Sequence, residues 1–88
     1  MKVLFDKSFH KRLIHIKDKQ VLGKVKQVIL QVEATADIQH IPNIKKMEGF
    51  KTFYRVRIGD YRIGLELRQD TVWFITIANR KDIYKIFP

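Results

Sequence analysis

The stretch from residue 54 to residue 63 holds the side chains best suited to chemistry. It reads Tyr-Arg-Val-Arg-Ile-Gly-Asp-Tyr-Arg-Ile, so apolar residues and arginines alternate on either side of a Gly59-Asp60 turn. This pattern predicts two antiparallel strands joined by a two-residue turn. In that register one face of the hairpin carries three arginines: Arg55, Arg57 and Arg62. Like charges side by side on a sheet cost stability, so the cluster indicates a site for an anion such as phosphate.

The charge of the whole chain agrees with an anionic partner. Its 88 residues carry 18 Lys and Arg against 9 Asp and Glu, a net charge of +9. Such an excess favours binding to nucleic acid or to an acidic protein. Five of the six arginines lie between residues 55 and 80, whereas the first half is basic through lysine. Since arginine binds phosphate with a planar fork, we expect the anion site in the second half.

Composition excludes several classes of site. There is no cysteine, which excludes disulfides, thiolate catalysis and Cys-based zinc sites. The three histidines show no metal-ligand spacing, so we expect no metal and no other cofactor. Asp6 ends the first apolar run too early for a signal peptide, and no run approaches the ~20 residues of a membrane span. We therefore expect a cytoplasmic protein of one domain, residues 1–88, that does not contact membranes.

Hydrophobic periodicity predicts the remaining elements. Residues 2–5 indicate a short strand, and Asp6 is a candidate N-cap for a helix that buries Phe9, Leu13 and Ile16. A second helix ends near Thr35 and carries a longer apolar stripe: Val21, Leu22, Val25, Val28, Ile29 and Val32. Residues 36–49 are predicted to be mostly loop. Three strands are predicted next, at residues 50–58, 61–68 and 71–78. A tail with a turn or short helix follows at residues 79–88.

These elements predict an α+β fold in two layers, because the apolar helix stripes and the apolar sheet face must bury each other. Two N-terminal helices would pack on a mainly antiparallel sheet of three to four strands, with the first strand at either edge. If the alternation of side chains between the two faces continues through the second hairpin, three apolar side chains lie on the arginine side beside Glu66: Trp73, Ile75 and Ile77.

Three motifs follow one another in a recognisable order. They are the Lys-rich segment Ile-Lys-Lys-Met-Glu-Gly at residues 44–49, the run 54–63, and the closing pair Arg80 and Tyr84. Together with the order of strands and helices, they resemble RelE-type toxins of the RelE/ParE superfamily, the toxin halves of bacterial and archaeal toxin–antitoxin pairs. The resemblance covers essentially the whole chain.

The resemblance implies a metal-independent endoribonuclease that enters the ribosomal A site and cuts the mRNA codon there. In that reaction the 2′-hydroxyl attacks the neighbouring phosphorus and a 2′,3′-cyclic phosphate forms. Matched by motif, Arg62 would bind the scissile phosphate, Arg80 would act at the leaving oxygen and Tyr84 would stack on a base. Arg55 and Arg57 match two basic positions on the first long strand of the family.

One departure from the family pattern concerns the proton acceptor. The best-known RelE pattern has lysines where this chain has Arg55 and Arg57. A lysine can act as a base, but a guanidinium essentially cannot. Arg57 would then position the phosphate and neutralise its charge. Deprotonation of the 2′-hydroxyl would depend on water, the ribosome or the geometry of the substrate. Glu66 is a further candidate base, but a role in offsetting the charge of the arginine cluster is favoured over catalysis.

The binding surface is expected to extend beyond these residues. Lys45, Lys46 and Lys51 form a predicted basic patch for RNA, including ribosomal RNA, and Trp73 could stack on a base or simply cover the sheet. The resemblance also implies a small cognate antitoxin that wraps the basic surface. No recognition helix is evident, so we expect no direct DNA binding by this chain.

Two other functions stay open from the sequence. A ParE-like toxin would inhibit DNA gyrase with the same fold, and a catalytically attenuated homologue would only bind an antitoxin. The full set of four arginines and Tyr84 favours RNA cleavage, because ParE-type chains generally lack it. The arginines in place of lysines favour attenuation. Arginines on a strand also commonly form nothing more than a solvated face.

Overall fold

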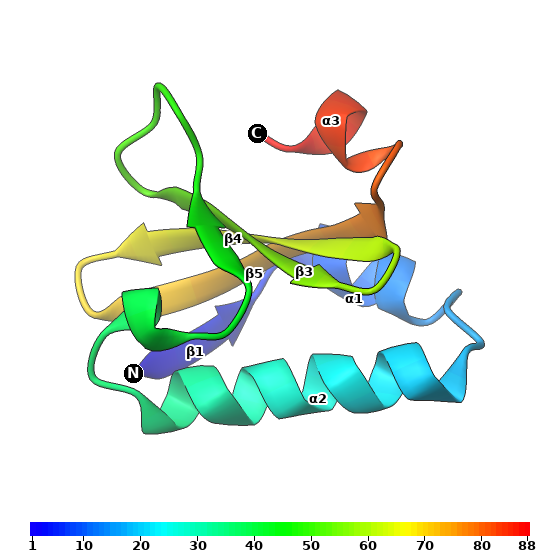
Figure 1. Ribbon diagram of the computed structural model, residues 1–88, viewed down its shortest axis with the longest axis horizontal. Coiled ribbons are helices and arrows are strands. Elements are labelled where there is room, and N and C mark those ends of the chain that lie inside the picture. Colours follow the sequence, from blue (N-terminus) through cyan, green and yellow to red (C-terminus); the bar gives the residue numbers. More distant parts are fainter.

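A mixed sheet carries helices on both sides in the computed structural model, which describes residues 1–88 (Figure 1). The long helix α2 (Lys19–Ala34) runs along one side of the sheet, and the short C-terminal helix α3 (Ile83–Ile86) lies on the other side. In chain order the elements are β1 (Lys2–Phe5), α1 (Lys7–Leu13), α2 (Lys19–Ala34), a 3₁₀ turn (Ile38–His40), β2 (Ile44–Lys46), β3 (Phe53–Ile58), β4 (Tyr61–Arg68), β5 (Thr71–Asn79) and α3 (Ile83–Ile86). The predicted α+β fold with two N-terminal helices on a sheet is confirmed.

The helices begin where the sequence indicates. The Asp6 carboxylate accepts a hydrogen bond from the Ser8 backbone N–H at 3.0 Å, which confirms Asp6 as the N-cap of α1. Asp18 caps α2 in the same way through the N–H of Gln20 at 2.9 Å. The predicted stripe of α2 faces the core, and three of its members are buried: Val25, Val28 and Val32.

The sheet has five strands in the order β1-β5-β4-β3-β2. β1 pairs in parallel with β5, which places the first strand at the β5 edge, and every other pair is antiparallel. The expected count of three to four strands was wrong because β2 lies in the segment predicted as loop. Three residues, 44–46, are too few to show an alternation. β3 also starts at Phe53, three residues later than predicted.

A β-bulge in β5 changes which side chains face the core. Leu65 pairs with Phe74 but Gly64 pairs with Thr76, so Ile75 is the extra residue. The bulge turns Ile77 into the core, where only 1% of it is exposed. The prediction that Ile77 lies on the arginine side was therefore wrong, because it assumed an unbroken alternation.

Apolar residues pack on both sides of the sheet. The main cluster lies between the sheet and the helices, where Phe9 of α1 meets Phe74 with ring centroids 5.4 Å apart. A smaller cluster lies on the opposite side beneath α3 and comprises Ala78, Ile83 and Phe87. This second cluster fixes the C-terminal segment on the side of the sheet that carries the arginines. No helix is long and apolar enough to cross a membrane.

Candidate functional site

The site is built on the side of the sheet opposite α2, here called the arginine face. Arg57 lies directly opposite Arg62, and Arg55 lies between Gly64 on one neighbouring strand and Lys45 on the other. Directly opposed residues point to the same side of a sheet, so these four cations share one surface. The predicted hairpin register is confirmed, including the pairing of Ile58 with Tyr61 around the Gly59-Asp60 turn.

A hollow of about 360 Å³ lies among these side chains, and we call it the arginine pocket. Its lining comprises Asn43, Ile44, Lys45, Arg55, Arg57 and Arg62, with no carboxylate. Four cations around one hollow make it electropositive, because their potentials add and the low-dielectric walls of a concave site focus the field. The arrangement suits an anion with several oxygens, such as a phosphodiester.

Arg62 is held in place by the backbone of the turn. Its Nη1 donates to the carbonyl oxygens of Gly59 at 2.9 Å and Tyr61 at 3.0 Å. These bonds use one nitrogen of a guanidinium that carries five N–H groups. The side chain is thus positioned before any ligand arrives, and its other nitrogens stay available to an anion.

Arg57 is exposed and is placed by Asn43. Its backbone N–H donates to the Asn43 carbonyl at 3.1 Å, and its Nη2 lies 3.5 Å from Asn43 Oδ1, a weak contact. Asn43 adopts a positive φ of 63°, which asparagine tolerates better than most residues. Asn43 was not predicted as a residue of the site. The sequence signal for it is the pair Pro42-Asn43, which is typical of a turn.

Arg55 is half-buried beneath the C-terminal helix. Its guanidinium carbon lies 4.7 Å from the centroid of the Tyr84 ring, a cation–π contact. Its Nη1 is buried and has no hydrogen-bond partner. An unpaired buried N–H is costly, and more so when it is charged. Tyr84 itself is 71% exposed, so one face of its ring is open to solvent.

Arg80 follows β5 directly and is exposed. Its backbone N–H donates to the carbonyl of Asp60 at 2.8 Å, which ties the end of β5 to the turn between β3 and β4. The backbone of Arg80 thereby lies at the same end of the hairpin as Arg62, whose cross-strand partner is Ala78.

The other end of the arginine face is already neutralised. Glu66 forms an ion pair with Arg68, with Oε1 at 2.6 Å from Nη2 and 2.8 Å from Nε. The guanidinium of Arg68 lies 4.7 Å from the centroid of the Trp73 ring. Glu66 is therefore engaged by a neighbour on its own strand, and Trp73 lies on the predicted face but beneath an arginine.

The three predicted RNA-binding lysines do not share one face. Lys45 pairs with Arg55 and lies on the arginine face, whereas Lys46 pairs with Tyr54, a core residue, and points to the opposite side. Lys51 is exposed in the connection between β2 and β3. The sequence showed the cluster of charge but not β2, whose pleat separates the first two lysines.

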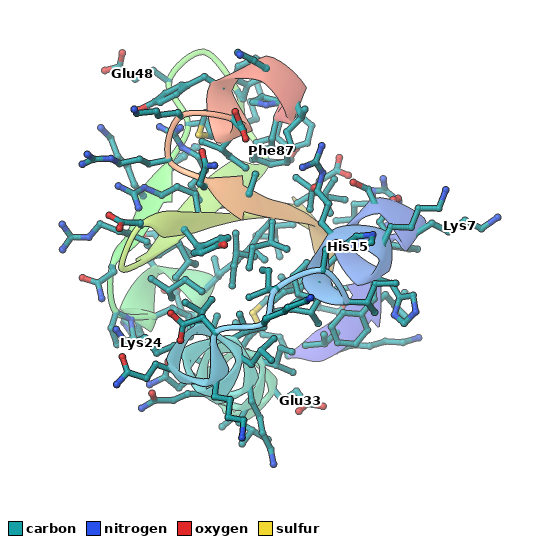
Figure 2. The ribbon with its side chains drawn as sticks, turned by 90° about the vertical axis from the view of Figure 1, so that its right-hand side faces the viewer. Lys7, His15, Lys24, Glu33, Glu48 and Phe87 are labelled. Carbon is teal, nitrogen blue, oxygen red and sulfur yellow. The ribbon has the colours of Figure 1, made fainter.

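Phe87 attaches the C-terminal helix to the sheet. Its ring lies against Gly64 and forms an edge contact with Phe53, with centroids 5.4 Å apart. In Figure 2 Phe87 and Lys24 of α2 lie on opposite sides of the sheet. The tail that carries Tyr84 is thus docked on the arginine face.

Comparison with known proteins agrees with this architecture. Residues 3–84 match the family model described as ParE toxin of type II toxin-antitoxin system, parDE. The chain is 38% identical over 89 residues to Toxin RelE3 of Methanocaldococcus jannaschii, with full coverage of both chains.

Solved structures give the same result. A RelB-RelE antitoxin-toxin complex from Methanococcus jannaschii superposes with a TM-score of 0.83 at 35% identity, covering 97% of this chain and 99% of that one. An archaeal RelE-RelB complex from Pyrococcus horikoshii OT3 shares the fold, with a TM-score of 0.73 at 20% identity and coverage of 90% and 93%. Sequence and structure together show that the chain belongs to the RelE/ParE family of toxins of type II toxin–antitoxin systems.

Proposed function

We propose that this toxin is a metal-independent, ribosome-dependent endoribonuclease that cleaves mRNA in the A site. The observation that carries the proposal is the arginine pocket, where Arg55, Arg57 and Arg62 surround one hollow without a carboxylate. Cleavage by transesterification places extra negative charge on a pentavalent phosphorus, and fixed cations stabilise that charge more than they stabilise the substrate.

The reaction forms a bond between the 2′-oxygen and phosphorus and breaks the bond from phosphorus to the 5′-oxygen. The 2′-hydroxyl loses its proton to water or to a ribosomal group, and the 5′-oxygen takes a proton from water as it leaves. Arg62, already held by the turn, binds the phosphate, and Arg57 neutralises it from the adjacent strand. Arg80 acts at the leaving oxygen.

Tyr84 stacks on a base of the codon. One face of its ring contacts Arg55 while the residue as a whole is exposed, so an incoming base has an aromatic surface to stack on.

The protein contributes charge and position to this reaction and not a base. Arginine stays protonated, and the candidate base Glu66 is paired with Arg68. Deprotonation of the 2′-hydroxyl then falls to water or to the ribosome. Preorganised cations alone account for large rate effects, since removal of one such donor costs about 10²–10³ in kcat in well-studied enzymes.

The test is primer extension along a translated reporter mRNA and an untranslatable copy after induced expression. Wild type should cut only the translated copy, and Arg62→Ala combined with Arg80→Ala should abolish the cuts. Arg12→Ala is the control, because it removes an exposed arginine of α1, which packs on the opposite side of the sheet. Growth arrest without cuts would overturn the proposal in favour of a target such as gyrase, and absence of both would favour an attenuated toxin.

We also propose that a cognate antitoxin of acidic character covers the arginine face. A chain of net charge +9 attracts such a segment, and folding on binding allows a short peptide to cover a large area. Inhibition follows either from occlusion of Arg62 and Arg80 or from displacement of the segment that carries Tyr84. A structure of the complex with these three residues open and in place would contradict this mechanism.

A further inference from the structure

A second hollow, of about 450 Å³, lies between α2 and the end of β3, and we call it the α2 hollow. One wall comes from Lys24, Gln27 and Gln31 of α2, and the other from Asn43 and Arg57. Its volume lies in the range of sites for small organic ligands, about 300–1,000 Å³. Nothing in the proposed chemistry uses this hollow.

The α2 hollow and the arginine pocket are contiguous. Asn43 and Arg57 line both of them, so the exposed Arg57 side chain stands on the ridge between the two. The bond from the Arg57 N–H to the Asn43 carbonyl fixes this ridge. A flexible polyanion bound at Arg62 therefore meets the α2 hollow directly after it passes Arg57.

The wall on α2 has a regular spacing. Lys24, Gln27 and Gln31 are related by i, i+3 and i+7, which places them along one side of the helix. Lys26, only two residues from Lys24, is also exposed but does not line the hollow. The hollow is thus defined by position on the helix and not by the general basic character of α2.

The lining has the chemistry of a nucleotide site. It contains two cations, Lys24 and Arg57, and no carboxylate, which suits a phosphate. It also contains three primary amides, those of Gln27, Gln31 and Asn43, and each amide offers both donors and an acceptor. Base edges present the same mixture, whereas the carboxylates of an acidic peptide present acceptors only. The amides and the two cations, contiguous with the arginine pocket, therefore suit a nucleotide of the RNA held there.

We propose that the α2 hollow binds a nucleotide of the mRNA. This nucleotide is adjacent to the phosphodiester that is held on the arginine face and cleaved there. Lys24 contacts its phosphate, and Gln27 with Gln31 contacts the edge of its base. This inference rests on the proposed ribonuclease function and extends it, because it assigns a second subsite that selects the nucleotide flanking the cleavage point.

The experiment compares Lys24→Glu with Lys26→Glu, two equal changes of charge on exposed positions of the same helix. Each purified toxin is titrated against ribosomes programmed with an mRNA whose A-site codon carries 2′-O-methyl groups and cannot be cut. Lys24→Glu should weaken binding about tenfold and lower the salt dependence of the affinity, and Lys26→Glu should leave the affinity within about threefold. Circular dichroism melting confirms that both variants are folded.

A second variant tests base contact without altering charge. Gln27→Leu combined with Gln31→Leu should flatten the dependence of the cleavage rate on the nucleotide flanking the cleavage point, measured over a set of reporter mRNAs. Equal effects of Lys24→Glu and Lys26→Glu, together with an unchanged flanking preference, would overturn the subsite while leaving the ribonuclease proposal intact. Loss of antitoxin affinity with unchanged ribosome binding would assign the hollow to the antitoxin instead. Wild-type toxin that neither binds nor cuts on programmed ribosomes would remove both proposals.

Discussion

The ring of Phe87 occupies the space that a side chain on Gly64 would need. A Cβ at position 64 would lie 2.7 Å from Cγ of Phe87 and 2.8 Å from the two Cδ atoms, closer than such contacts occur in folded proteins. Phe87 is 3% exposed, and the same tail segment carries Tyr84 over Arg55. The absence of a side chain in the middle of β4 thus determines where the C-terminal helix docks.

Gly64→Ala should therefore destabilise the protein and loosen its tail. Overpacking of this kind costs about 1–3 kcal/mol, and urea unfolding measures that loss. Hydrogen exchange should rise selectively at residues 83–87. Gly23→Ala is the control, since nothing lies within 4 Å of a Cβ there, and helix propensity predicts a gain of about 0.5–1 kcal/mol. If Gly64→Ala leaves both the stability and the hydrogen exchange of residues 83–87 unchanged, the position of Phe87 does not depend on the missing side chain at residue 64.

The two roles of the Tyr84 ring can be separated by substitution. Tyr84→Phe keeps an aromatic face for Arg55 and for a base, so cleavage should stay within about threefold of wild type. Tyr84→Ala removes the stacking surface, worth about 1–3 kcal/mol per base, and should slow cleavage on programmed ribosomes by about 5- to 150-fold. Because the side chain is 71% exposed, unfolding free energy should change by under about 1 kcal/mol. A large loss of stability in Tyr84→Ala would instead make Tyr84 a structural residue.

Replacement of Arg57 by lysine should add to the pH profile of the reaction a titrating group that wild type lacks. A lysine introduced at this position would lie beside Arg62 and near Arg55, and neighbouring positive charge lowers the pKa of an amine. The neutral amine could then accept the 2′-hydroxyl proton, so the rate of Arg57→Lys should rise as pH increases through that lowered pKa. Single-turnover cleavage between about pH 6 and 9 measures both profiles. Identical profiles would show that position 57 takes no part in proton transfer.

The two hairpin turns offer opposite changes in stability. Gln69 adopts a φ of 56°, which is unfavourable for a residue with a side chain, so Gln69→Gly should stabilise the fold by up to about 1 kcal/mol. Gly59 has a φ of 61°, so Gly59→Ala should destabilise it by a similar amount. For a chain of this size each change corresponds to a shift in Tm of about 4–8 °C, which differential scanning calorimetry resolves. Shifts of the same sign in both variants would contradict the argument from backbone conformation.

Local patterns in the sequence predicted the parts of the fold that depend on neighbouring residues. The hairpin around Gly59-Asp60 has the predicted register because its turn and its alternation agree. Asp6 caps a helix as expected, since the capping interaction spans two residues. Three of the predicted catalytic residues, Arg55, Arg57 and Arg62, line one pocket for the same reason.

Features that depend on distant pairings were not predictable in this way. The bulge at Ile75 arises between β4 and β5 and has no signal in the alternation of β5. β2 exists because Lys45 and its neighbours pair with β3, and that pairing separates Lys45 from Lys46. The α2 hollow joins residues of a helix to residues more than ten positions further along the chain, which no motif could indicate.

The parallel pairing of β1 with β5 sets the order in which the molecule can be completed during its synthesis. Val3 aligns with Val72, so the first strand has no partner until most of the chain has been made. A nascent chain that stops before residue 71 has β2, β3 and β4 but lacks the strand that joins them to β1, and it lacks Arg80 and Tyr84. Arg80 and Tyr84 therefore join the arginines of β3 and β4 only after β5 has been made.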